Sequence, residues 1–211
     1  MTLSRSENVR KLCALAPIVP VLVVHDIADA RPLAEALVRG GLPVLEVTLR
    51  TPVALEAISE MSKVDGGHVG AGTLVTAQDV TDAINAGATF GVSPGATDSL
   101  LDATEAAGLP MLPGAATASE AMRLLARGYD VQKFFPAEAA GGVPALKGIG
   151  APLPQITFCP TGGINPKNAN DYLGLSNVIC AGGSWVAPND LIKAQDWDGI
   201  EALARAAAQL G

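Results

Sequence analysis

The chain has 211 residues, of which 49% are hydrophobic and only 17% are charged, so it is long enough for one domain with a large buried core. Its net charge of −7 argues against a nucleic-acid partner, which would select a basic face, although backbone amides can still bind a phosphate group. The longest apolar strand-like run, 17–24, is too short to span a membrane. Residues 1–11 lack the apolar core of a signal peptide, so the three cysteines predict reduced thiols and a cytoplasmic location.

A short N-terminal helix is predicted at 4–15, and β-type runs then alternate with helical segments along the rest of the chain. The eight predicted strands are 17–24, 44–49, 68–72, 89–92, 110–112, 131–135, 156–159 and 178–181. The helices that follow them are predicted at 28–40, 52–62, 76–86, 97–107, 117–127, 145–149, 166–173 and 188–210. Pro52 at the start of one helix and Gly87 after the end of another are typical helix boundaries.

Nearly all of these strands lack the strict polar and apolar alternation of a half-exposed sheet. Apolar strands that alternate with helices are typical of a parallel sheet covered by helices. Eight such units predict an α/β fold, namely a single (β/α)8 TIM barrel over residues 1–211 with an extra N-terminal helix. An open doubly wound sheet is the alternative, but no G-x-G-x-x-G motif opens a helix after a strand to favour it.

Three polar residues on the second predicted strand share one face. Because alternate side chains of a strand point to the same side, Glu46, Thr48 and Arg50 lie together, opposite an apolar face that must meet the helices. The polar face therefore points into the barrel, where an acid and a base must be paired or take part in chemistry. An internal ion pair between Glu46 and Arg50 is the structural alternative.

Lys133 lies in a β-type run beside Phe134 and Phe135. A strand lysine is more often solvated, but the carboxyl ends of barrel strands carry function, and this end also holds Glu46. A free lysine amine is almost wholly protonated at neutral pH, whereas burial favours the neutral amine that attacks a ketone and forms an imine. We therefore interpret Lys133 as an imine-forming residue.

Other polar residues at the same ends complete the predicted site. Glu46 is the carboxylate best placed to move protons for the imine chemistry. Arg50 and Thr73 suit a substrate carboxylate, through a planar fork and a hydroxyl donor. The two histidines are 43 positions apart and match no zinc pattern, so no metal is predicted.

Glycines follow the seventh and eighth predicted strands. Gly162 and Gly163 lie between the seventh strand and its helix, and Gly183 and Ser184 follow the eighth strand. Barrels commonly bind phosphate at these two loops, through backbone amides and a helix N-terminus. The alternative is that the glycines only form tight turns.

Six segments together resemble the family of class I aldolases that act on 2-keto-3-deoxy-6-phosphogluconate (KDPG) and 4-hydroxy-2-oxoglutarate. These are VLEVTLRT at 44–51, GAGT at 70–73, SPG at 93–95, KFFPAE at 133–138, CPTGG at 159–163 and GGSW at 182–185. The resemblance runs over nearly the whole chain. It implies a homotrimeric lyase of the Entner–Doudoroff pathway, which cleaves KDPG to pyruvate and D-glyceraldehyde 3-phosphate and 4-hydroxy-2-oxoglutarate to pyruvate and glyoxylate.

The resemblance also implies roles for individual residues, with no cofactor. Lys133 would form the Schiff base, and Glu46 would accept and return the proton. Arg50 and Thr73 would bind the pyruvate carboxylate. The phosphate would be bound by Gly162, Gly163, Gly183 and Ser184, and the pocket would be lined by Pro94, Phe135 and Thr161. Two alternatives stay open, an aldolase for the galactonate epimer of KDPG and a non-covalent sugar-phosphate isomerase or epimerase with Glu46 as its base.

Overall fold

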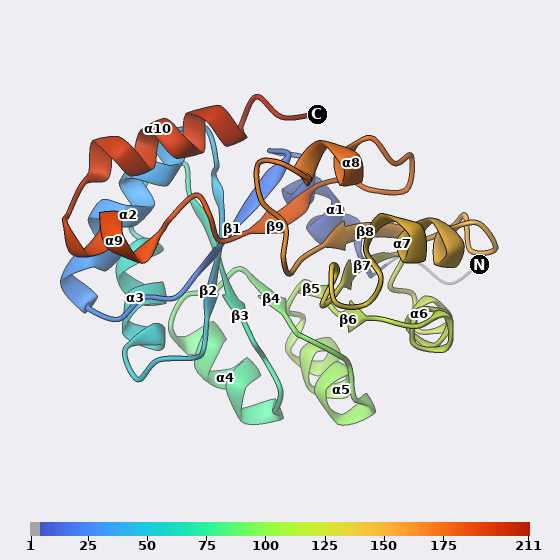
Figure 1. The fold of residues 1–211 in the computed structure, drawn as a ribbon. Coiled ribbons are helices and arrows are strands. Elements are labelled where there is room, and N and C mark those ends of the chain that lie inside the picture. Colours follow the sequence, from blue (N-terminus) through green and yellow to red (C-terminus); the bar gives the residue numbers. More distant parts are fainter. Residues whose placement is uncertain (1–4) are drawn as a thin grey trace.

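The computed structural model describes residues 5–211 and shows an α/β protein in which paired strands run parallel (Figure 1). The strands are β1 (Ile18–Leu22), β2 (Val44–Thr48), β3 (His68–Gly72), β4 (Phe90–Val92), β5 (Met111–Leu112), β6 (Gly114–Ala115), β7 (Val131–Phe134), β8 (Thr157–Pro160) and β9 (Ala181–Gly183). Six of them form one sheet in the order β5-β4-β3-β2-β1-β9, and the other three form a sheet in the order β6-β7-β8.

The helices surround the strands in Figure 1. They are α1 (Glu7–Cys13), α2 (Ile27–Arg39), α3 (Ala54–Met61), α4 (Ala77–Asn85), α5 (Asp98–Ala107), α6 (Ala118–Ala126), α7 (Gly142–Gly150), α8 (Ala169–Leu173), α9 (Asn189–Lys193) and α10 (Trp197–Ala207). Capping boxes start α4 and α6, where the Thr76 and Thr117 hydroxyls accept backbone hydrogen bonds from Asp79 and Glu120. Within residues 5–211, no helix is both long and apolar enough to cross a bilayer.

The alternation of strands and helices is confirmed, but the expectation of eight strands is corrected in two places. The predicted strand at 110–112 is followed directly by β6, because Pro113 has no N–H and its carbonyl accepts a hydrogen bond from Lys133 N–H at 2.9 Å. Pairing therefore switches from β4 to β7 at this proline. The last strand is β9 rather than 178–181, since Val178 forms only an isolated bridge with Phe158.

The helix predictions need smaller corrections. The predicted helix at 188–210 is divided into α9 and α10, and Gln195 between them has a left-handed backbone with φ of 52°. The N-terminal helix begins at Glu7, and Ser4, where we predicted its start, lies outside the described residues.

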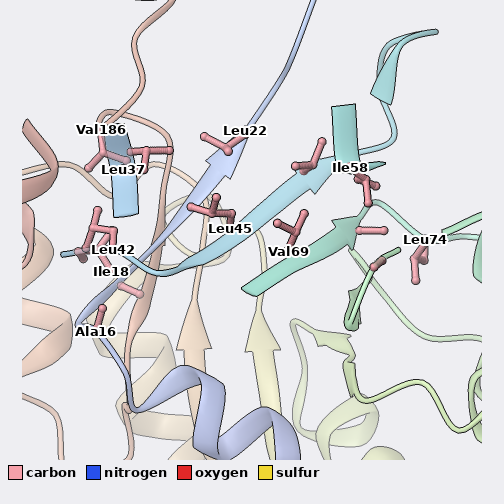
Figure 2. Close-up of a cluster of buried hydrophobic side chains, with 14 of the residues drawn as sticks. Ala16, Ile18, Leu22, Leu37, Leu42, Leu45, Ile58, Val69, Leu74 and Val186 are labelled. Carbon is pink, nitrogen blue, oxygen red and sulfur yellow. The ribbon is translucent and has the colours of Figure 1, made fainter. Parts of the chain in front are cut away.

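Buried apolar side chains form two clusters on opposite faces of the strands. The larger cluster lies between strands and helices, and Figure 2 shows the part of it that extends over β1, β2 and β3, with Leu22, Leu45 and Val69. The second cluster lies on the other face and includes Val44 of β2 and Val131 of β7. Val9 and Cys13 of α1 belong to it, as do Cys159 and Cys180, so the N-terminal helix covers this inner cluster.

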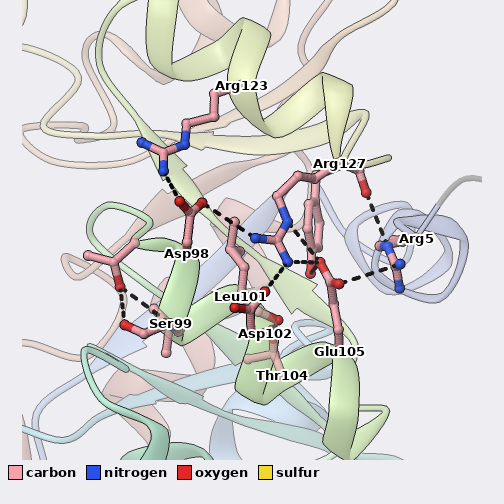
Figure 3. Close-up of polar contacts among 12 residues, drawn as sticks. Arg5, Asp98, Ser99, Leu101, Asp102, Thr104, Glu105, Arg123 and Arg127 are labelled. Atoms are coloured by element: carbon pink, nitrogen blue, oxygen red, sulfur yellow. Dashed lines mark hydrogen bonds and ion pairs between the residues drawn. The ribbon is translucent and has the colours of Figure 1, made fainter.

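A network of ion pairs attaches the end of α6 to α5 and to the N-terminal segment (Figure 3). The Arg127 guanidinium lies 2.6 Å from Asp102 and 2.9 Å from Glu105, and Arg5 lies 3.4 Å from Glu105. The hydrogen bond to Asp102 raises the pKa of Arg127, so this side chain stays charged. Because residues 128–130 lead from Arg127 into β7, the network fixes the start of the strand that carries Lys133.

Candidate active site

Glu46 and Lys133 form a buried ion pair between the two sheets. Each lies two residues beyond a member of the inner cluster, Val44 on β2 and Val131 on β7, so both side chains point to the inner face. The Lys133 Nζ donates to Glu46 Oε1 at 3.0 Å and to Oε2 at 3.3 Å. The two residues are only 5% and 3% exposed, so the pair is shielded from water. The structural alternative, in which Glu46 pairs with Arg50, is not what the structure shows.

Two neighbours shape the surroundings of the pair. The ring centroid of Phe135 lies 5.3 Å from Lys133 Nζ, within the range of a cation–π contact. Gly72, the last residue of β3, leaves the space that the Glu46 carboxylate occupies, because a Cβ there would lie 2.4 Å from Oε1 and 2.7 Å from Cγ. Sequence reasoning placed Gly72 at the end of the third predicted strand, in the GAGT segment, but gave it no role.

The contact between Gly72 and Glu46 leads to a testable prediction. Gly72→Ala should displace the Glu46 carboxylate from Lys133 and lower kcat/KM, for the aldol cleavage that the sequence resemblance implies, by roughly 10²-fold, the effect of a misplacement of about 1 Å. The measurement is steady-state kinetics with a coupled pyruvate assay. Gly148→Ala in α7 is the matched control, since no heavy atom lies within 4 Å of its added Cβ. Equal activity of the two variants would contradict the positioning role of Gly72.

Arg50 and Thr73, the predicted carboxylate-binding residues, lie just beyond β2 and β3. Arg50 is exposed, because β2 ends at Thr48 and the Arg50 N–H turns back to donate to the Thr48 carbonyl at 2.8 Å. Its side chain Nε also donates to the Thr48 hydroxyl at 3.1 Å. Thr73 is half-buried and has φ of 66°, a strained backbone for a β-branched residue that is found mainly where function requires it.

The glycine loop 161–163 follows β8 and presents backbone amides. Ala137 N–H donates to the Thr161 carbonyl at 2.8 Å, and Glu138 N–H donates to the Gly162 carbonyl at 3.1 Å. In a trans peptide the N–H points opposite to the carbonyl, so the N–H groups of Gly162 and Gly163 both point away from the turn that follows β7. Gly162 and Gly163 have positive φ angles of 103° and 80°, which glycine adopts readily, so the loop can present both amides on one side.

The remaining predicted residues lie at the same ends of the strands. Thr161 is buried and bridges to Gly182 of β9, which places the glycine loop next to Gly183 and Ser184. Gly183 is buried at the end of β9, and Ser184 is exposed. Pro94 and Gly95 are exposed and follow the buried Ser93, the first residue after β4. The carboxyl ends of β2, β3, β4, β7, β8 and β9 therefore carry the whole predicted set.

A second hydrogen-bonded pair, which sequence reasoning did not find, lies beside the glycine loop. The Tyr172 hydroxyl of α8 donates to Glu138 Oε1. Glu138 belongs to the KFFPAE segment, but its partner is 34 residues away along the chain, and no local pattern reports that contact. Within residues 5–211, no group of three or more His, Cys, Asp or Glu side chains is arranged to bind a metal ion.

Comparisons with known proteins show one family over nearly the whole chain. A protein-family model described as KDPG and KHG aldolase matches residues 9–203. A curated relative from Pseudoalteromonas atlantica, named 2-dehydro-3-deoxy-phosphogluconate aldolase, is 50% identical over 98% of this chain and 97% of its own.

Two solved structures are similar over nearly their whole length. The KDPG aldolase of Zymomonas mobilis with 3-phosphoglycerate has a TM-score of 0.94 and 49% identity, covering 98% of this chain and 97% of that one. The KDPG aldolase of Legionella pneumophila, with pyruvate captured as a covalent carbinolamine intermediate, has a TM-score of 0.92 and 48% identity, covering 95% and 98%. The chain therefore belongs to the KDPG and KHG aldolase family, whose members are lyases.

Proposed function

We propose that the protein is a class I aldolase that cleaves KDPG to pyruvate and D-glyceraldehyde 3-phosphate, and 4-hydroxy-2-oxoglutarate to pyruvate and glyoxylate. The observation that carries this proposal is the buried contact of 3.0 Å between Lys133 Nζ and Glu46 Oε1. A lysine amine becomes a nucleophile when it loses its proton, and Glu46 is in place to accept that proton.

The proposed reaction uses these two side chains in turn. The neutral Lys133 amine attacks the C2 ketone of the substrate and forms a carbinolamine. The proton that Glu46 took from the amine goes to the carbinolamine oxygen, which leaves as water and gives an iminium ion. Glu46 removes the proton of the C4 hydroxyl, the C3–C4 bond breaks, and its electron pair moves into the iminium to give an enamine while the aldehyde leaves. Glu46 returns the proton to C3, and water then hydrolyses the resulting pyruvate imine to pyruvate and the free amine.

The other residues position the substrate. Arg50 offers a planar fork and Thr73 a hydroxyl for the pyruvate carboxylate, at the carboxyl ends of β2 and β3. The amides of Gly162 and Gly163, which point away from the turn after β7, would bind the phosphate together with Gly183 and Ser184. The pocket between these groups would be lined by Pro94, Phe135 and Thr161.

The two sheets would close into one (β/α)8 barrel that forms a single domain over residues 1–211. Two facts support closure. β5 and β6 are separated only by Pro113, and isolated parallel bridges connect Phe158 of β8 with Val178, which precedes β9, and Thr161, which follows β8, with Gly182 of β9. The inner cluster, to which strands of both sheets contribute, would fill the barrel interior. The homotrimer and the cytoplasmic location stay predictions from the family resemblance.

Trapping of the imine tests the proposed function. Borohydride added in the presence of pyruvate should reduce the Schiff base and leave a carboxyethyl group on Lys133, which peptide mass spectrometry would locate. KDPG and 4-hydroxy-2-oxoglutarate should both release pyruvate, and a chelator should leave the rate unchanged because the lysine imine needs no metal. A protein that stays unlabelled, or is labelled at another lysine such as Lys147, would contradict the proposal and favour a non-covalent isomerase.

A further inference from the structure

Glu138 contacts the glycine loop with both its backbone and its side chain. Its N–H donates to the Gly162 carbonyl at 3.1 Å, and this bond directs the N–H of Gly163 to the opposite side. Its side chain packs beside Gly163, where an added Cβ would lie 2.6 Å from Glu138 Cγ and 2.7 Å from Cβ. The position of Glu138 therefore decides where the amides of the loop point.

Tyr172 anchors Glu138. The tyrosine belongs to α8 and is fully buried, and its hydroxyl donates to the Glu138 carboxylate, whereas Glu138 itself is exposed. Burial, and then the hydrogen bond and charge of Glu138, raise the pKa of Tyr172, so the hydroxyl keeps the proton that it donates. A core residue thus holds a surface carboxylate in one conformation.

The end of the glycine loop at Gly163 is held by residues other than Glu138 and Tyr172. The side-chain amides of Asn165 and Asn168 both donate to the Gly163 carbonyl at 3.2 Å. At the other end Ala137 N–H holds the Thr161 carbonyl, and only the bond from Glu138 N–H to the Gly162 carbonyl depends on the pair of Glu138 and Tyr172. Loss of the pair would leave the fold and the asparagine bonds in place but release the Gly162–Gly163 peptide.

We propose that Glu138, anchored by Tyr172, is a positioning residue that aims the glycine-loop amides at the substrate phosphate and so sets the preference for phosphorylated over phosphate-free substrates. The inference rests on the proposed function, because it assigns the phosphate to this loop. It also explains why a carboxylate can lie beside an anion site. The Tyr172 hydroxyl binds the carboxylate, and only the backbone N–H of Glu138 faces the loop carbonyl.

The experiment compares two substrates that differ in the phosphate. Glu138→Ala and Tyr172→Phe should each raise KM for KDPG about tenfold, the factor for one lost hydrogen bond to a charged group, with kcat little changed. The kcat/KM for 4-hydroxy-2-oxoglutarate, which has no phosphate, should stay at the wild-type value. Glu138→Gln should rescue KDPG binding, since its amide oxygen can accept the Tyr172 hydrogen bond at the same length.

Glu60→Ala on α3 is the matched control, because that glutamate is also partly exposed and paired, with Lys63 at 2.6 Å. Equal loss for both substrates, or unchanged KM for KDPG in Glu138→Ala and Tyr172→Phe, would overturn the inference. If Glu138→Ala fails to fold, the KM of Tyr172→Phe for KDPG decides whether the inference holds, since this variant removes a single oxygen atom. A wild-type protein that cleaves neither substrate would instead refute the proposed function, so the two failures are distinguishable.

Discussion

Lys133→Ala should abolish aldol cleavage, with kcat reduced by on the order of 10⁴-fold or more, as happens when a covalent nucleophile is removed. Without the amine no imine forms, and the C3–C4 bond has no electron sink. Borohydride with pyruvate should then leave the protein unlabelled. Single-turnover measurements of pyruvate release from KDPG, compared with wild-type protein at the same concentration, give the size of the loss.

The control for this variant must separate chemistry from stability. Lys133→Ala leaves the Glu46 carboxylate buried without its cation, which costs about 3–5 kcal/mol for a fully buried pair. Lys133→Arg keeps a positive charge beside Glu46 but has no amine that can form an imine. Urea unfolding should place Lys133→Arg closer to wild type than Lys133→Ala, while both are inactive. Retained turnover in a folded Lys133→Arg protein would refute covalent catalysis.

Glu46→Gln should lower kcat for KDPG by about 10²–10⁴-fold, the usual contribution of a positioned acid–base group. The amide keeps the size of the side chain but can neither accept the C4 hydroxyl proton nor return a proton to C3. Exchange of the pyruvate methyl hydrogens with deuterated water, followed by NMR, isolates the second of these steps. We expect that exchange to be lost in Glu46→Gln.

Glu201→Gln on α10 is the matched control, because Glu201 is also a glutamate in ion pairs, with Arg39 at 2.8 Å and Arg205 at 2.6 Å, and has no contact with the strand that carries Lys133 among the ion pairs of residues 5–211. It should exchange the methyl hydrogens at the wild-type rate. Labelling of Lys133 by borohydride and pyruvate should still reach completion in Glu46→Gln but more slowly, since the lysine supplies the imine nitrogen and Glu46 only accepts its proton. Methyl exchange at the wild-type rate in Glu46→Gln would assign the proton transfer to another group.

Strand parity predicted that Glu46 points inward, and the count of barrel strands placed Lys133 at the same end of the molecule. Glu46 and Lys133 both follow an inward apolar residue by two positions, and that local period suffices to place them on the inner face. The same alternation predicted that Arg50 also points inward, but Arg50 is exposed because β2 ends at Thr48 and the backbone turns back there. Alternation is informative only while a strand continues, and the end of a strand depends on its pairing with neighbours.

Long-range pairing also explains the errors in the fold. The apolar run 178–181 has strand-like residues, yet β9 comprises 181–183 because Ile18, Val19 and Pro20 of β1 pair with those three residues. Such a register is set by strands that are far apart in sequence, and local hydrophobicity does not encode it. The pair of Glu138 and Tyr172 was missed for the same reason, since it joins two elements that meet only in the folded chain.

The ion pair of Glu46 and Lys133 has a consequence for assembly of the fold. Glu46 belongs to the six-stranded sheet and Lys133 to the three-stranded sheet, so each sheet carries one inward charge of opposite sign. If either sheet excluded water from its inner face before it met the other sheet, it would bury an ion without a partner of opposite charge. We infer that Lys133, the proposed imine-forming residue, also disfavours half-assembled or mispaired states through this charge pairing. One side chain would then serve both the proposed reaction and the selection of the native arrangement of the strands.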